Sequence, residues 1–229
     1  MLVLFAQFPE MVFVDGTYKV NKYGFPLYHV MIQDNLGRGR TVFYAFVSNE
    51  TAPMLSRMMA EFRSFVGDVE RVKTAMVDCD QNEILAIREH LPNASVQLCT
   101  FHVLKNMKKR VAELLLPAQE KTRIFRLCRD LLYSQSLEEF ERRLMLVNEA
   151  NAEIGSYLRN SWCDDAEMWV AFHRKQVITF GNDTNNIMES ENGKIKHVLC
   201  SSSSQSSCRP PLKLRSKTLT RLFIPYWPL

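Results

Sequence analysis

Short runs of hydrophobic residues, separated by turn-forming residues, dominate the first part of the chain. Three runs rich in aromatic and β-branched residues, at 11–14, 25–32 and 41–47, predict three β-strands. The first of them ends at an Asp-Gly pair, which predicts a turn there. The segment 34–39 contains Asp, Asn and two Gly, which is typical of a turn between strands. We therefore expect a three-strand antiparallel meander.

The following segments alternate between helical and extended patterns. Apolar residues at helical spacing predict helices over 54–65 and 82–91. Apolar runs at 71–77 and 95–101 predict a fourth and a fifth strand, and the fifth is expected to end at His102.

This order of elements predicts where the strands meet. A strand that follows a linking helix returns parallel to a neighbour, because parallel pairing needs a crossover connection. If the fourth strand returns beside the first, Asp15 and Asp78 lie side by side at the carboxyl ends of adjacent central strands. Open α/β sheets bind their ligands at that edge. The expected fold class is α/β, with a mixed sheet that combines the meander with parallel strands.

The remainder of the chain divides into a helical block, a last helix and a tail. The pattern from 103 to about 171 is helical throughout and predicts an all-helical insertion. Within it, Trp162 and Trp169 are expected to pack in the core rather than to stack on bases. The chain then becomes serine-rich and basic, which predicts a disordered tail over 200–229. The globular domain is predicted at 8–199.

The last helix, after residue 184, is amphipathic. Its apolar residues Met188 and Ile195 fall on one face at about 100° per residue. A carboxylate, an amide and an ammonium group line one flank: Glu189, Asn192 and Lys196. A solvated helix flank explains this stretch taken alone, and only the aspartates at the predicted sheet edge favour a functional interpretation.

Charge is distributed unevenly. The 229 residues carry 29 Lys and Arg against 25 Asp and Glu, a formal net charge of +4. Five basic and no acidic residues lie in 201–229, so the rest of the chain is close to neutral. The densest basic patch outside the tail contains Lys105, Lys108, Lys109 and Arg110. This patch is either a solvated helix face or a set of salt-sensitive contacts to nucleic-acid phosphates.

The cysteines indicate a reducing compartment. The six cysteines show no C-x-x-C motif and no regular spacing, which favours free thiols over a disulfide-stapled secreted fold. The apolar start at 1–6 is a poor signal peptide, and no apolar run approaches the roughly 20 residues of a membrane span. No glycine-rich phosphate loop follows a strand. We expect an intracellular protein without a membrane partner or a small-molecule cofactor.

Three carboxylates could converge on the predicted sheet edge: Asp15, Asp78 and Glu189. Such a group can hold two divalent cations about 3.5 to 4 Å apart. A hard cation such as Mg²⁺ prefers oxygen ligands, and a pair of them supports in-line displacement at phosphorus. Because the chain has 25 acidic residues, Asp80 and Glu191 remain alternatives.

Four stretches match an ordered set of motifs. They are Val-Asp-Gly-Thr-Tyr-Lys at 14–19, Met-Val-Asp-Cys-Asp at 76–80, Cys-Thr-Phe-His at 99–102, and Thr-Asn-Asn followed by Glu, Ser and Asn within 184–192. In this order they resemble the Mutator-like (MULE) transposase domain, in the version carried by SWIM zinc-finger (ZSWIM) proteins. The resemblance implies an RNase H-like fold with a D-D-E metal site.

Carried over position by position, the resemblance implies Asp15, Asp78 and Glu189 as catalytic residues and as ligands of Mg²⁺ or Mn²⁺. Asn185 and Asn192, together with Lys196, are expected beside these ligands or facing the substrate.

The C-x-x-H pattern of the family lies on Cys99 and His102. It lacks two of the four usual zinc ligands, so we expect no complete zinc site in this chain. Cys99 is expected to be a buried thiol. We favour His102 as a group beside the metal ligands or facing the substrate, and a hydrogen-bonded histidine at a strand end explains it equally well.

The resemblance implies a domain that cleaves or transfers DNA strands by two-metal phosphoryl transfer in the nucleus. It also allows a homo-oligomer. The alternative is a domesticated, catalytically silent nuclear module that binds nucleic acid or protein. The presence of a carboxylate at all three acidic positions of the motif favours the first function. The near-neutral charge of the globular part favours the second function. The family's DNA-recognition module and SWIM zinc motif are not found in this sequence, which also favours the second function. The sequence leaves open whether the domain is an enzyme.

Overall fold

The strands form where the chain is most deeply buried. The computed structural model describes residues 1–18 and 23–201, with the backbone alone for 189, 190, 196 and 198–201. β1 (Met11–Thr17) and β2 (Leu27–Gln33) are buried along most of their length, and β4 (Thr74–Val77) is buried at every position. β3 (Gly39–Phe46) is less buried because it lies at the edge of the sheet.

The chain forms two compact units. The first comprises Met1–Ala94 and the chain from Asn185 onward, and the second comprises Ser95–Thr184. The domain bounds expected from the sequence, 8–199 with an insertion at about 103–171, stay a prediction.

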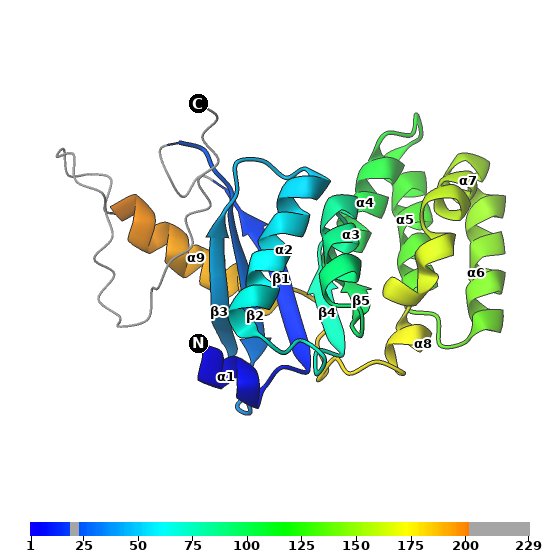
Figure 1. Ribbon diagram of the computed structural model, residues 1–229. Helices are drawn as coiled ribbons and strands as arrows, with labels where there is room; N and C mark the ends of the chain where they lie inside the picture. The colour runs from blue at the N-terminus through cyan, green and yellow to red at the C-terminus, as the bar shows by residue number, and fades with distance from the viewer. Residues whose placement is uncertain (19–22, 202–229) are drawn as a thin grey trace. The chain divides into compact units, whose positions relative to one another are not determined.

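In the first unit, β1 pairs antiparallel with β2, and β2 pairs antiparallel with β3 (Figure 1). The chain then passes through α2 (Ala52–Val66), and β4 returns parallel to β1. The predicted meander and the predicted parallel return beside the first strand are therefore both confirmed. The fold class is α/β with a mixed sheet flanked by helices, consistent with an RNase H-like fold.

Helices cover both faces of this sheet. On one face lie α2 and α3 (Gln81–His90), and Phe62 of α2 packs edge-on against Phe43 of β3, with ring centroids 5.5 Å apart (Figure 1). On the other face lies α9 (Asn186–Ser201). Met188 of α9 is fully buried in a cluster of four methionines and a phenylalanine from the strands and α9, which comprises Met11, Phe13, Met31, Met76 and Met188.

Gly39 allows α9 to approach the edge strand. A Cβ atom at this position would lie 2.1 Å from Cγ2 of Ile187 and 2.5 Å from Cε of Met31. No side chain larger than hydrogen fits such a gap without moving the helix or the methionine. The glycine that the sequence placed in a turn thus also serves the packing of the last helix.

The second unit is mainly helical. It begins with β5 (Ser95–Leu98) and continues with α4 (Thr100–Ala112), α5 (Ala118–Leu132), α6 (Leu137–Ala150), α7 (Ala152–Ser161), a 3₁₀ helix η1 (Cys163–Met168) and α8 (Ala171–Arg174). A short helix, α1 (Leu2–Gln7), precedes β1 in the first unit.

Two tryptophans form the core of the helical unit, as predicted. Trp169 is fully buried, and its ring meets those of Trp162 and Phe140 edge-on, at centroid distances of 5.9 Å each. The indole Nε1–H of Trp169 donates to the carbonyl oxygen of Trp162 at 2.9 Å, which satisfies a polar group that burial would otherwise leave unpaired.

Two predicted element ends are wrong. β1 does not turn at Asp15 but continues to Thr17, because every residue from Val12 to Thr17 pairs with β2. β5 ends at Leu98, and His102 lies within α4 rather than at a strand end. The helix begins at Thr100 because both the main-chain N–H and the hydroxyl of Thr100 donate to the carbonyl oxygen of Asp183, at 2.9 Å.

Other expectations concern cysteines and the tail. The cysteines within the described part of the chain, at 79, 99, 128 and 163, are free thiols, and Cys99 is buried as predicted. The expected tail lies almost entirely outside the described residues, as does Cys208. No helix within residues 1–18 and 23–201 has the length and apolar character needed to cross a membrane.

Phe62→Ala is expected to lower the free energy of unfolding by about 3 to 5 kcal/mol, because it removes a fully buried ring that packs on both Phe5 and Phe43. Urea denaturation followed by circular dichroism measures the loss. Leu36→Ala, at a side chain that is 66% exposed, is the matched control and should change stability by less than about 0.5 kcal/mol. Equal effects of the two substitutions would contradict the assigned core.

Candidate active site

The parallel pairing of β1 with β4 brings two aspartates to one edge of the sheet. The register aligns Phe13 with Met76, and Asp15 and Asp78 each follow two residues later. Side chains alternate between the faces of a strand, so Asp15 shares the face of Phe13, which is the face that α9 covers. Of the two aspartates singled out in the sequence, Asp15 therefore lies within β1 and Asp78 follows directly after the end of the neighbouring strand β4.

Two asparagines contact these aspartates, Asn185 from the position directly before α9 and Asn192 from within the helix. Nδ2 of Asn192 donates to Oδ2 of Asp15 at 2.6 Å, and Nδ2 of Asn185 donates to Oδ1 of Asp78 at 3.0 Å. Asn185 is 2% exposed, so its amide is held in the interior. A single element thus supplies one amide to each carboxylate.

Glu189 and Lys196, the other two candidates on this segment, lie on α9 itself. Glu189 follows the buried Met188 and precedes Asn192 by about one helical turn. The side chains of Glu189 and Lys196 lie outside the described part of the structure. Their roles stay predictions.

Asp80, the alternative to Asp78 as a ligand, has a structural task. It is the N-cap of α3, and its Oδ1 accepts hydrogen bonds from the main-chain N–H groups of Asn82 and Glu83, at 2.8 and 3.2 Å. An N-cap carboxylate satisfies helix N–H groups that have no partner within the helix. This arrangement favours Asp78 over Asp80 as the chemically active residue.

Glu83 is a buried carboxyl group that sequence analysis missed. It lies in the first turn of α3 and is 6% exposed. Burial raises its pKa well above the usual value, and the negative charges of Asp78, Asp15 and Asp80 raise it further. The hydrogen bond with Tyr28 acts in the opposite direction, and burial still favours the protonated form of Glu83 over the charged one. Its position three residues after an N-cap is typical of an exposed capping glutamate, so the local sequence pointed away from burial.

Tyr28 joins Glu83 to Glu50. The hydroxyl oxygen of Tyr28 lies 2.8 Å from Oε1 of Glu50 and 2.8 Å from Oε1 of Glu83. The tyrosine hydroxyl has one proton and can donate to only one of these carboxyl groups. A protonated Glu83 can donate to the hydroxyl oxygen in the other contact. Tyr28 reaches this position because its neighbour across the sheet is Gly16, where a Cβ atom would lie 2.8 Å from the tyrosine ring.

His29 is a second buried polar group that the sequence analysis did not single out. It is the cross-strand partner of Asp15, is fully buried and stacks on Tyr44 with ring centroids 6.0 Å apart. Burial lowers the pKa of His29 to about 4, although the side chain of Asn192 and the charge of Glu191 act in the opposite direction. The imidazole is therefore neutral at pH 7 and adds no positive charge beside Asp15.

The remaining candidates belong to the helical unit. The ring of His102 meets that of Phe101 edge-on at 5.2 Å, within the first turn of α4. Cys99 and His102 carry the thiol and the imidazole that metal ions commonly bind, and both belong to the second unit.

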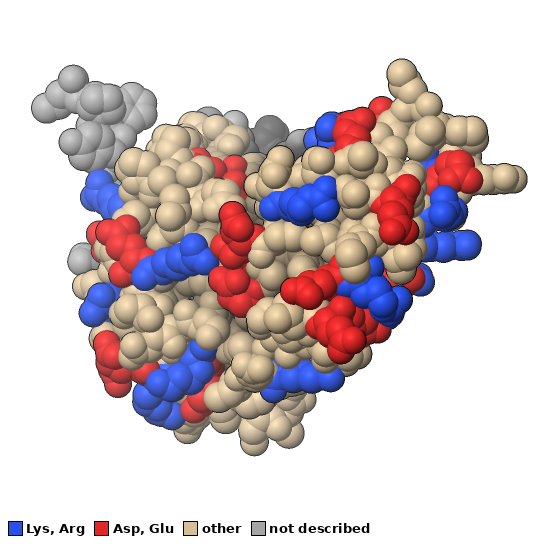
Figure 2. All heavy atoms as spheres, turned by 90° about the vertical axis from the view of Figure 1, so that its right-hand side faces the viewer, with Lys and Arg blue, Asp and Glu red and all other residues tan. Residues whose placement is uncertain are grey.

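The basic patch lies on α4. Lys105, Lys108 and Lys109 are exposed, whereas Arg110 donates to carboxylate oxygens of Glu113 and Glu153 at 2.8 Å each. On the face that Figure 2 shows, basic and acidic side chains are interspersed, and neither sign forms a continuous patch. Pairing with nearby acids therefore reduces the positive field expected from the sequence, most clearly at Arg110.

Comparison with known proteins places this geometry in a family. Residues 1–97, which include β1, β4, Asp15 and Asp78, match the model of the RNase H-like domain of zinc finger SWIM domain-containing proteins 1 and 3. Residues 1–97 are a ZSWIM-type RNase H-like domain. The resemblance noted in the motifs is confirmed for this part of the chain.

Relatives match other shares of the chain. Over 214 residues the chain is 25% identical to the mouse (Mus musculus) protein named uncharacterized protein ZSWIM9. The aligned region covers 90% of this chain and 46% of ZSWIM9. Over 100 residues the chain is 29% identical to the PKS-NRPS hybrid synthetase cheA of Chaetomium globosum. That aligned region covers 43% of this chain and 2% of the synthetase. The chain thus spans less than half the length of these relatives.

Glu83→Gln replaces the buried carboxyl group of Glu83 with an amide that cannot ionise, and so tests how protonation of Glu83 affects stability. Because the folded protein holds the Glu83 proton more tightly than the unfolded chain does, wild-type stability should fall as the pH rises above the usual carboxyl pKa of 4.5. The variant should not show this decline in stability, because glutamine does not ionise. Urea denaturation at about pH 5 and about pH 8 should show a smaller loss of stability for Glu83→Gln than for the wild type. Parallel pH profiles would show that Glu83 ionises normally.

Proposed function

We propose that this domain is a cation-dependent phosphoryl-transfer domain of the Mutator-like DDE type that acts on DNA in the nucleus. The observation that carries the proposal is the pair of carboxylates at one sheet edge, Asp15 and Asp78, each held by an amide from the α9 segment. Ligands bind at this edge in open α/β sheets. Glu189, on the same helix as Asn192, is the proposed third carboxylate.

The residues present fit Mg²⁺ or Mn²⁺. Their donor atoms are carboxylate oxygens, which hard cations prefer. Asp78 and Asp15 lie close enough to Glu83 to contribute, after burial, to its raised pKa. Asp15 belongs to no group of three ligand residues within 4.8 Å among the described side chains. Glu189 is proposed as the third ligand because the motif resemblance implies an acidic ligand at that position.

The chain's own groups orient and insulate the site. The amides of Asn185 and Asn192 restrict rotation of the two carboxylates, as hydrogen-bonding partners of metal ligands commonly do. Burial favours the uncharged forms of Glu83 and His29, which limits the buried charge near the two carboxylates. Two bound divalent cations would supply activation of the attacking hydroxyl and stabilisation of the charge that develops at phosphorus.

The proposed contact to DNA uses the exposed lysines of α4. Lys105, Lys108 and Lys109 can each approach a backbone phosphate, and such contacts release counterions and weaken with salt. Arg110 is assigned a smaller share, because its guanidinium already binds two glutamates. Contacts of this kind position DNA without reading its sequence.

Asp78→Asn should abolish Mn²⁺ binding in a calorimetric titration of the full chain and should abolish Mn²⁺-dependent nicking of supercoiled DNA. The substitution removes the charge of one proposed ligand and preserves its shape. Asp68→Asn, at an exposed loop carboxylate of the same unit, is the matched control and should retain both activities.

The outcomes separate the two candidate functions. Absence of Mn²⁺ binding by the folded wild type would overturn the metal site. Binding of Mn²⁺ and DNA without nicking would instead support the catalytically silent binding module, which has the same fold and keeps the same residues for another purpose.

Asn192→Leu should weaken Mn²⁺ binding about tenfold or more, because loss of a hydrogen-bonding partner typically costs a metal site about 10- to 100-fold in affinity. Leucine has the branched shape of asparagine, although it is larger, and it cannot donate to Asp15. The same calorimetric titration measures the effect. Unchanged affinity would show that the amide does not orient the carboxylate.

A further inference from the structure

A buried histidine lies beside the candidate site without a hydrogen bond of its own. His29 is fully buried within β2, and neither of its ring nitrogens has a hydrogen-bond partner among the residues that the structure describes. A buried polar group that stays unpaired destabilises the folded protein, and such groups are rare in native structures. The unpaired imidazole therefore needs an explanation beyond the packing of the sheet.

Three side chains form a row across the sheet, on the face that α9 covers. Asp15 of β1 is paired with His29 of β2, and His29 is paired with Tyr44 of β3. Residues directly opposite each other on paired strands point to the same face. The rings of His29 and Tyr44 stack with an angle of 4° between their planes and with centroids 6.0 Å apart. This stack fixes the plane of the imidazole.

The amide of Asn192 on α9 connects the two ends of this arrangement. Its Nδ2 donates to Oδ2 of Asp15 at 2.6 Å. Its Oδ1 is buried and has no hydrogen-bond partner within the described part of the chain. Burial lowers the pKa of His29, and the side chain of Asn192 acts against this, as a nearby hydrogen-bond acceptor does. An unpaired acceptor on α9 thus lies close to an unpaired imidazole on β2.

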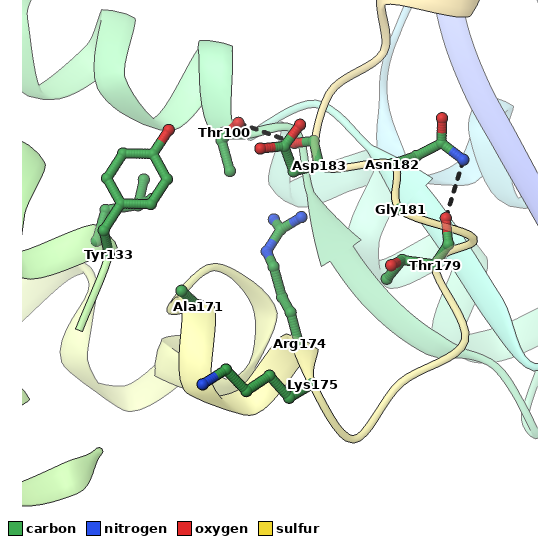
Figure 3. Close-up of a pocket in the computed structure, with 10 residues that line it drawn as sticks. Thr100, Tyr133, Ala171, Arg174, Lys175, Thr179, Gly181, Asn182 and Asp183 are labelled. Atoms are coloured by element: carbon green, nitrogen blue, oxygen red, sulfur yellow. Dashed lines mark hydrogen bonds between the residues drawn. The ribbon is translucent and has the colours of Figure 1, made fainter. Parts of the chain in front are cut away.

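The pocket of the helical unit shows the contrasting case of a buried polar group that is already engaged. This pocket lies beside α8 and has a volume of about 280 Å³. Arg174 of α8 points toward Asp183 there, and its Nη2 donates to the main-chain carbonyl oxygens of Leu98 and Met168 (Figure 3). These contacts join α8 to the ends of β5 and η1. Arg174 therefore needs no ligand to explain its burial, in contrast to His29.

We propose that His29 is a positioning residue whose ring N–H donates to Oδ1 of Asn192 and so keeps the amide nitrogen of Asn192 turned toward Asp15. A neutral imidazole has one N–H donor, which is sufficient for this contact. Without that donor the amide can turn over, and its oxygen then meets the carboxylate of Asp15, where two acceptors repel each other. The inference rests on the proposed metal site: Asn192 orients the ligand Asp15, and His29 orients Asn192.

His29→Phe should weaken Mn²⁺ binding to the full chain about tenfold in a calorimetric titration, the loss also expected for Asn192→Leu. Phenylalanine is larger and keeps a ring that can stack on Tyr44, but it has no N–H donor. His29→Gln keeps a donor and should retain most of the affinity. His90→Phe, at a histidine of α3 whose Nε2 lies 2.9 Å from Oγ of Ser56, is the matched control and should bind Mn²⁺ as the wild type does.

A double variant separates positioning from a general effect on packing. If His29 acts through Asn192, His29→Phe combined with Asn192→Leu should bind Mn²⁺ no more weakly than Asn192→Leu alone. Independent effects would instead multiply to a loss of about a hundredfold. That result would overturn the proposal.

A measurement without metal tests the contact by itself. NMR spectra of the ¹⁵N-labelled full chain in EDTA contain the side-chain NH₂ signals of Asn192, which are identified by their absence from Asn192→Leu. In His29→Phe these signals should shift and exchange faster with water, because the amide is no longer held at both ends. In His90→Phe they should stay as in the wild type. Unchanged signals in folded His29→Phe would show that the imidazole does not hold the amide.

The combined outcomes distinguish this inference from the proposed function. Amide signals that depend on His29, in a chain that binds no Mn²⁺, would support the contact and sink only the metal site. Mn²⁺ binding that Asn192→Leu weakens and His29→Phe leaves unchanged would sink only the role of His29.

Discussion

Packing of Met188 against the sheet is the interaction on which the candidate active site depends. Met188 is fully buried among methionine and phenylalanine side chains of β1, β2 and β4. Asn185 precedes it by three residues and Asn192 follows it by four, so all three share one side of the α9 segment. Burial of one apolar side chain therefore also turns both amides toward the aspartates, and Gly39 leaves the space that this helix needs.

Burial also controls the charges at this sheet edge. Asp15 and Asp78 lie near a carboxyl group, Glu83, and an imidazole, His29, that are both deeply buried. Desolvation disfavours the charged form of each, which raises the pKa of Glu83 and lowers that of His29. Burial thus favours the uncharged form of both groups beside the aspartates.

The two units make different contributions. The first contains the part of the chain that matches the ZSWIM RNase H-like domain, with the paired strands and both aspartates. The second is a set of helices around Trp169, with its exposed lysines on α4 and a pocket beside α8. The proposed metal site belongs to the first unit and the proposed nucleic-acid contacts belong to the second, so each proposal can be tested separately.

The sequence by itself determined the order and type of the main elements, because apolar spacing and turn residues are local signals. It also placed Asp15 beside Asp78, because a helical crossover requires parallel strands, and the pairing of β1 with β4 agrees. It misplaced the end of β1 and the start of α4, which depend on pairing with β2 and on the Asp183 carbonyl. Only the tertiary structure decided that Glu83 and His29 are buried, which favours their uncharged forms. Desolvation arises from segments distant in the chain, and no local pattern records it.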